Sequence, residues 1–140
     1  LWYAQLHFKP KRIFDIATLT GAIIIALGKE YAGVFSNNDK FCNEFLTVCA
    51  KSNEKAWRLP LDQKFGDKLS SCVTDLTNVG GSQGSSIIAA MFLNNFVKKE
   101  TPWVHLDIAG VAKNTETTFS STGATAWGVV SLFEYLQEFS

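Results

Sequence analysis

A turn of small and hydroxylated residues at Asp15–Ala22, with the sequence DIATLTGA, is the first candidate for chemistry in this chain. It follows a short stretch with strand character and opens an apolar helical stretch. It is therefore expected at the carboxyl end of a strand, the edge of an α/β sheet where ligands bind. Backbone N–H groups at a helix start favour anions or carbonyl oxygens, and Gly21 lets a ligand approach without a Cβ in the way. These residues fit a ligand-binding turn and a plain βα turn equally well.

A second candidate is the segment Gly80–Gly84, GGSQG, which matches the GxSxG pattern of a nucleophile elbow. A serine hydrolase would then need an acid and a histidine downstream, and Glu100 is the acid that lies between Ser82 and His105. The stretch before Gly80 is only weakly strand-like. We favour a flexible loop that allows close backbone approach, and we keep a nucleophilic Ser82 as a hypothesis.

Metal-binding patterns are weak. The two histidines are far apart, no HExxH motif is present, and the three cysteines form no CxxC pair. On a strand His105 and Asp107 would point the same way, yet a structural histidine is the favoured interpretation. No metal ligand set is assigned to this chain. The cysteines are interpreted as small buried hydrophobic residues in a cytoplasmic protein.

Hydropathy patterning predicts the elements that must position these candidates. Apolar residues at 41, 45, 48 and 49 predict a helix after N-cap candidates at 37–39. In the last helix Val129, Leu132, Phe133 and Leu136 are expected to form the packing face. We expect 52–78 to be mostly irregular, with loops at 80–86 and 113–122. Strands are expected at 12–17, 32–35 and 103–109, and further helices at 1–8, 22–27, 87–97 and 125–139.

This alternation of strands and helices predicts an α/β layered fold. The chain has 140 residues, 46% of them hydrophobic, which fits one domain and argues against disorder. Thirteen Lys and Arg balance thirteen Asp and Glu, so binding to nucleic acid by phosphate neutralisation is not expected. The apolar run at 22–27 is much shorter than the roughly 20 residues of a membrane span, so no membrane association is expected.

Several blocks of the chain, taken in order, resemble the leucine aminopeptidase (cytosol aminopeptidase) family. The turn at 15–22 is the first of them, and the resemblance covers nearly all 140 residues. The further blocks are AGVFS at 32–36, WRLPL at 57–61, DLTN at 75–78, HLDIAG at 105–110 and GAT at 123–125.

The resemblance implies a three-layer α/β/α sandwich with a mixed, mainly parallel sheet, as part of a larger catalytic domain. It implies a two-metal aminopeptidase that removes N-terminal residues, preferably leucine, from peptides. Two divalent ions, zinc, manganese or magnesium, would activate a water, and a bicarbonate would serve as general base. The full-length protein would be a cytoplasmic homo-hexamer with peptide substrates.

The resemblance also assigns substrate contacts to particular residues. Thr18 and Gly21 match residues that line the pocket for the N-terminal side chain, and Ala109 and Ala112 match its floor. Leu19 matches a residue whose backbone contacts the substrate peptide. Such a small apolar pocket accepts Leu and discriminates by only about 1–3 kcal/mol per methylene.

Val79 matches an apolar wall of the next pocket along. No catalytic residue and no metal ligand of the family maps onto this chain, because the family motif NTDAEGRL and the lysines before it are absent. We therefore expect residues 1–140 to be the C-terminal portion of the catalytic domain, without the N-terminal regulatory domain or the first part of the catalytic domain. The isolated chain is expected to be inactive. The alternative is a non-catalytic assembly or binding module.

Overall fold

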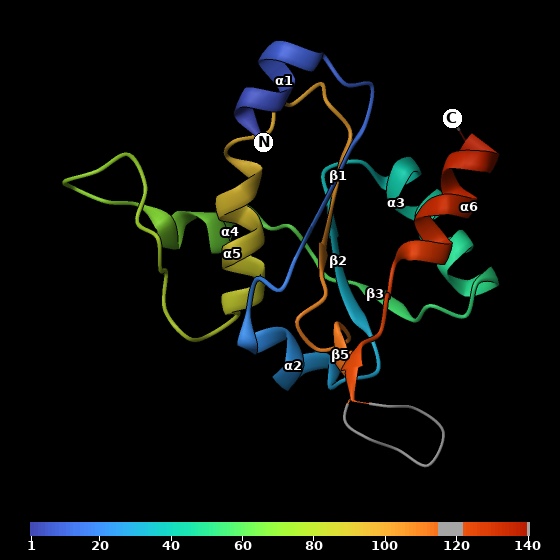
Figure 1. Ribbon diagram of the computed structural model, residues 1–140. Helices are drawn as coiled ribbons and strands as arrows, with labels where there is room; N and C mark the ends of the chain where they lie inside the picture. Colours follow the sequence, from blue (N-terminus) through green and yellow to red (C-terminus); the bar gives the residue numbers. More distant parts are fainter. Residues whose placement is uncertain (115–121, 140) are drawn as a thin grey trace.

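The computed structural model describes residues 1–114 and 122–139 and has a four-stranded sheet at its centre (Figure 1). The strand order is β1-β4-β2-β3. The β1/β4 and β2/β3 pairs are parallel and the β2/β4 pair is antiparallel, so the sheet is mixed and mainly parallel, as predicted. The strands are β1 (Ile13–Ala17), β2 (Ala32–Ser36), β3 (Ala56–Arg58) and β4 (Trp103–Asp107).

Helices cover both faces of this sheet, which gives the three layers expected from the family resemblance. Helices α3 and α6 pack on one face, and α2 and α5 pack on the other (Figure 1). A short antiparallel ladder, β5 with β6, precedes α6. These elements are α1 (Trp2–Phe8), α2 (Gly21–Leu27), α3 (Asp39–Lys51), α4 (Gln63–Gly66), the 3-10 turn η1 (Asp67–Leu69), α5 (Ser85–Asn94), β5 (Lys113–Asn114), β6 (Gly123–Ala124) and α6 (Val129–Phe139).

The core on the α3 and α6 face is aromatic. Phe14 of β1 meets the rings of Phe41, Phe45 and Tyr135 at centroid distances of 4.7, 4.9 and 5.1 Å. The predicted N-cap is present, because the Asn38 side chain accepts a hydrogen bond of 2.9 Å from the N–H of Phe41. The apolar stripe of α3 is buried, as its spacing predicted.

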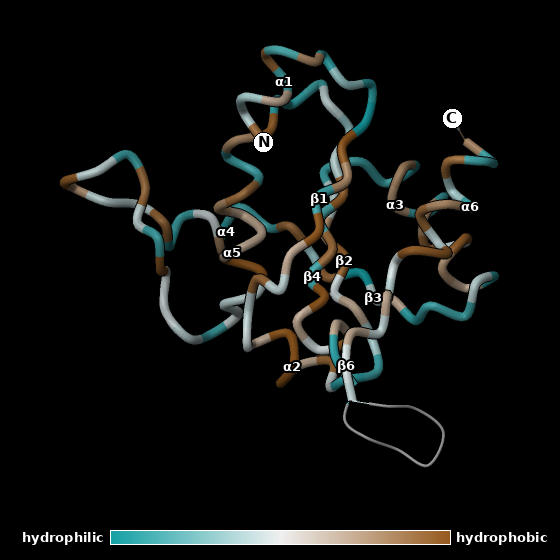
Figure 2. The backbone as a smooth tube through the Cα atoms, viewed as in Figure 1, coloured by the Kyte–Doolittle hydropathy of each residue, from teal (hydrophilic) through white to brown (hydrophobic). Residues whose placement is uncertain are grey.

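The core on the opposite face is smaller and brings α2 close to the sheet. Ile23 packs there with Phe35 and Ala90. Gly33 makes room for it, since a Cβ on Gly33 would lie 2.4 Å from the Cδ1 of Ile23. Figure 2 shows α2 in hydrophobic colours, although Ile25 on its outer side is 89% exposed.

The packing face predicted for α6 is wrong for three of its four residues. Val129, Phe133 and Leu136 are exposed, whereas Ser131 and Tyr135 are buried. The reason is the Tyr135 ring, which packs among the phenylalanines of the core and turns the helix accordingly. Leu132 packs against the edge of the same core.

The segment predicted as mostly irregular, 52–78, contains β3, α4 and η1. A three-residue strand such as β3 is too short to show a hydropathy period. Of the predicted polar loop at 113–122, the ends form β5 and lead into β6, and residues 115–121 lie outside the described residues. Within the ranges that the structure describes, no helix has the length and hydropathy needed to cross a bilayer.

Candidate functional site

The turn between β1 and α2 lies on the surface of the structure. Thr18, Leu19 and Gly21 are exposed, and they connect the carboxyl end of a strand to the start of a helix (Figure 1). Thr20 is the N-cap, and its hydroxyl accepts a hydrogen bond of 3.2 Å from the N–H of Ile23. The exposed backbone and small side chains of this turn are suited to contact a ligand.

The segment that follows β4 reaches the same edge of the sheet, because β1 and β4 are parallel neighbours. The N–H of Ile108 donates to the carbonyl oxygen of Ala17 at 2.9 Å, which extends the ladder by one step. Ala109 and Ala112 lie just beyond, and both are half-buried. Five of the six residues assigned by the resemblance are thus on two segments that meet at one sheet edge.

Close backbone packing keeps the second segment against α2. A Cβ on Gly110 would lie 2.3 Å from the carbonyl oxygen of Gly28, at the end of that helix. Since the neighbour is a backbone atom, it cannot move aside as a flexible side chain would. Glycine is therefore required at position 110.

Asp107 makes contacts at this sheet edge that the sequence did not reveal. Its carboxylate accepts hydrogen bonds from Leu19 N at 3.1 Å, Thr20 Oγ1 at 2.7 Å, Thr20 N at 3.5 Å and Ala109 N at 3.3 Å. The N–H of Leu19 is therefore engaged, which leaves the Leu19 carbonyl oxygen as its backbone group for a ligand. The sequence places Asp107 on one strand face with His105, for which a structural role is favoured and no metal ligand set is assigned.

Val79 lies apart from these two segments in its packing. It belongs to the loop between η1 and α5 and is 76% exposed. The Thr77 hydroxyl donates to its carbonyl oxygen at 3.3 Å. The Val79 side chain thus forms no packed wall within the part of the chain that the structure describes, and its role stays a prediction.

The geometry does not assemble a nucleophile elbow around Ser82. Ser82 is exposed, and the segment before Gly80 forms no strand in the described structure. His105 is fully buried, and its Nδ1 lies 2.6 Å from Asp15 Oδ1. With its histidine buried and already paired, the GxSxG match is a loop rather than a catalytic site.

His105, Asp107 and Asp15 also do not fit a metal site. The Asp107 oxygens are taken by N–H and O–H donors. One Asp15 oxygen pairs with His105 Nδ1, and the other accepts a hydrogen bond from the Trp103 indole N–H. Among the described residues, no group of three or more His, Cys, Asp or Glu side chains could hold a metal ion. The donor set at this edge of the sheet therefore suits hydrogen bonding, not metal coordination.

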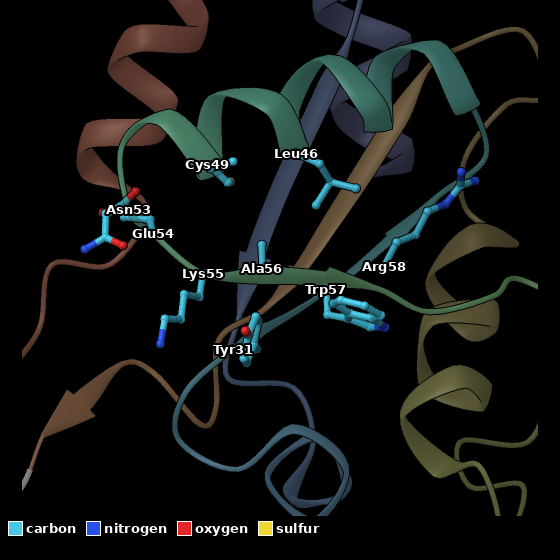
Figure 3. Close-up of a pocket in the computed structure, with 10 residues that line it drawn as sticks. Tyr31, Leu46, Cys49, Asn53, Glu54, Lys55, Ala56, Trp57 and Arg58 are labelled. Carbon is cyan, nitrogen blue, oxygen red and sulfur yellow. The ribbon is translucent and has the colours of Figure 1, made fainter.

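A hollow of about 500 Å³ lies elsewhere, between α3 and β3 (Figure 3). Leu46 and Cys49 line it from the helix, and Ala56 and Trp57 line it from the strand. Burial raises the pKa of Cys49 to about 12, so its thiol is protonated and a poor nucleophile at neutral pH. None of the residues that the resemblance assigns to substrate contact lines this hollow.

Comparison with known proteins decides the family. The family model for the cytosol aminopeptidase family, catalytic domain, matches residues 1–133. This chain belongs to the cytosol aminopeptidase family. A probable cytosol aminopeptidase of Cereibacter sphaeroides is 50% identical over 139 residues, which are 99% of this chain and 28% of that protein.

Solved structures of this family share the fold. A tomato leucine aminopeptidase mutant matches with a TM-score of 0.87 and 36% identity over 96% of this chain and 26% of its own. The bottromycin maturation enzyme BotP, in complex with Mn, matches with a TM-score of 0.86 and 36% identity over 91% of this chain and 28% of its own. The chain thus spans little more than a quarter of the length of the relatives it matches.

Proposed function

We propose that this chain is the C-terminal portion of the catalytic domain of a two-metal aminopeptidase, and that it supplies walls of the substrate pocket. One observation supports this most directly. The turn that carries Thr18, Leu19 and Gly21 meets the segment that carries Ala109 and Ala112 at one edge of the sheet. In a member of the cytosol aminopeptidase family, these are the segments expected to receive the N-terminal residue of a peptide.

The residue types suit a leucine side chain. Gly21 has no heavy atom within 4 Å of the position where a Cβ would stand, so the space beside it is open. The alanine methyl groups at 109 and 112 offer small, apolar side chains for the floor of the pocket. Leucine is therefore the preferred N-terminal residue in this proposal, with weak discrimination against other apolar side chains. Val79 would line the next pocket along.

The chemistry of the reaction is assigned to the rest of the full-length protein. Two divalent ions, zinc or manganese or else magnesium, would supply an activated water there, and a bicarbonate would assist. A relative of this family was solved in complex with Mn, which supports the metal dependence. The ligands would come from the part of the full-length protein outside this chain, since the described residues hold no group of three or more His, Cys, Asp or Glu that fits a metal.

The full-length protein would act as a homo-hexamer in the cytoplasm, with an N-terminal regulatory domain before the catalytic domain. The names of the relatives, cytosol aminopeptidases, support this location. Peptides with a free amino terminus would be its substrates, and no nucleic acid or membrane partner is proposed.

The test compares two proteins in one assay. Full-length protein and isolated residues 1–140 are each incubated with leucine p-nitroanilide and with Mn²⁺ or Zn²⁺. We expect hydrolysis by the full-length protein, its loss with a chelator, and none by the isolated chain. A full-length protein that binds leucyl peptides without hydrolysing them would overturn the proposal and favour the non-catalytic binding module. Hydrolysis by the isolated chain would show that the chemistry lies within it.

A further inference from the structure

Asp107 lies where the two walls of the proposed pocket separate. The parallel ladder of β1 and β4 ends at the pair Ala17 and Asp107. Beyond that pair the chain enters the turn on one side and the Ala109 segment on the other. The Asp107 side chain is 1% exposed, so its hydrogen bonds form away from competing water.

The donors to this carboxylate come from both walls. Leu19 N at 3.1 Å and Thr20 Oγ1 at 2.7 Å belong to the turn, and Ala109 N at 3.3 Å belongs to the other segment. Thr20 also links Asp107 to the start of α2, since the Thr20 hydroxyl accepts a hydrogen bond from Ile23 N. A single buried anion thus fixes the spacing of the two walls and the start of α2.

We propose that Asp107 is a positioning residue for substrate selection: it sets the width of the side-chain pocket between the turn and the Ala109 segment. This inference rests on the proposed aminopeptidase function. A carboxylate is the suitable group because every neighbour named above donates to it. An amide in its place could keep Oδ1 toward the three backbone N–H groups and donate from its NH2 group to the Thr20 hydroxyl, but the negative charge that strengthens these hydrogen bonds would be lost.

The experiment uses the full-length protein with Mn²⁺ and compares leucine and alanine p-nitroanilides. Asp107→Asn is expected to lower kcat/KM for the leucine substrate about tenfold, because hydrogen bonds to a neutral amide are weaker than those to a carboxylate. Asp107→Ala is expected to lower it about 100-fold, since a wall displaced by about 1 Å has an effect of that size. The ratio of kcat/KM for leucine p-nitroanilide to kcat/KM for alanine p-nitroanilide falls in both variants, mainly because KM for the leucine substrate rises.

Glu54→Gln is the matched control. Glu54 also accepts two backbone hydrogen bonds, from Gly128 N and Ser131 N at 2.9 Å each, but at the start of α6. Its leucine to alanine ratio is expected to stay within about twofold of the wild type, which is less than 0.5 kcal/mol. A second pair keeps the test informative if Asp107→Ala does not fold: Thr20→Ser keeps the hydroxyl and should retain the ratio better than Thr20→Val.

The outcomes separate the two proposals. If the wild type hydrolyses the leucine substrate while folded Asp107→Asn and Thr20→Val keep the wild-type ratio, the positioning role is overturned and the proposed function stands. If Glu54→Gln lowers the ratio as much as Asp107→Asn, the effect reflects general stability and the positioning role is again overturned. A wild type with no hydrolysis under any metal overturns both.

Discussion

Two carboxylates, one on each face of the sheet, accept hydrogen bonds from backbone N–H groups. Asp107, at the end of β4, accepts backbone hydrogen bonds on the face that α2 and α5 cover. Glu54, in the loop between α3 and β3, accepts backbone hydrogen bonds of 2.9 Å from Gly128 and Ser131 on the face that α3 and α6 cover. The first is buried and the second is half-buried.

The difference lies in what their donors belong to. Both donors of Glu54 are at the start of one helix, so its loss would fray that helix end. The donors of Asp107 are on two segments: Leu19 lies 88 residues away from Asp107 in sequence, and Ala109 lies two residues away. Its loss would therefore change the distance between two walls. One carboxylate stabilises the start of a helix, and the other holds together two segments that we propose to be walls of the substrate pocket.

The largest effect on stability is expected when Asp107 and Glu54 are each replaced by alanine, in two separate variants. Asp107→Ala leaves several partly buried donors without their acceptor and should lower the free energy of unfolding by about 3 kcal/mol. Glu54→Ala removes a helix cap and should lower it by about 1 kcal/mol. Urea denaturation followed by circular dichroism measures both. Equal losses would show that Asp107 is no more than a second cap.

Gly110→Ala perturbs the same face through packing alone. The new Cβ would lie 2.3 Å from the Gly28 carbonyl oxygen, so the backbone must shift, and we expect a loss of about 2 kcal/mol. Gly123→Ala is the matched control, because nothing lies within 4 Å of its Cβ, and its loss should be below about 0.5 kcal/mol. The same melting experiment on both variants tests this. Equal stability of the two would mean that the Ala109 segment does not pack against α2 as described.

Gly21→Ala should separate activity from stability on this face. The added Cβ meets no heavy atom within 4 Å, so the free energy of unfolding should be unchanged or slightly higher. In the proposed pocket the methyl group takes up substrate space, and kcat/KM for leucine p-nitroanilide should fall about tenfold. Asn43→Ala, exposed on α3 across the sheet, should leave both quantities unchanged. A fully active Gly21→Ala variant would remove Gly21 from the pocket wall.

Local patterns in the sequence predicted the elements that carry the site. The βα turn, the Thr20 start of α2 and the periodic stripe of α3 all depend on residues within a few positions of one another. The three layers and the mixed sheet followed from the family resemblance and were confirmed. Five of the proposed contacts come together because β1 and β4 are parallel neighbours, which hydropathy alone does not reveal.

The features that were missed depend on distant partners. The role of Asp107 is set by Leu19 and Thr20, far away in the sequence, and no spacing rule indicates it. The buried face of α6 is chosen by Tyr135, whose ring fits among phenylalanines of β1 and α3. In both cases tertiary packing made the choice: it selected the buried face of α6 and the hydrogen-bond partners of Asp107, which the local sequence pattern does not distinguish.

The smallest effect is expected in the reactivity of the cysteines near neutral pH. Two of them, Cys42 and Cys49, belong to the core on the α3 and α6 face. Cys42 and Cys49 are buried and Cys72 is exposed. Burial raises the pKa of Cys42, and it raises the pKa of Cys49 from its ordinary 9.0 to about 12. At pH 8 iodoacetamide should therefore modify Cys72 alone in the folded protein, and all three thiols in urea. Mass spectrometry of the alkylated peptides shows which thiols reacted.

Alkaline pH extends this test, and the sign follows from the two pKa values of Cys49. The unfolded thiol loses its proton near pH 9, whereas the folded thiol keeps it to about pH 12. Between these values the unfolded state binds fewer protons, so stability is full below pH 9 and falls as the pH rises. Cys49→Ala should flatten that fall, measured as the urea midpoint at pH 8 and pH 10. If the fall is unchanged, or if folded Cys49 reacts as fast as Cys72, the α3 and α6 face opens readily. The contrast between a closed structural face, capped by Glu54, and an open binding face, ordered by Asp107, would then be lost.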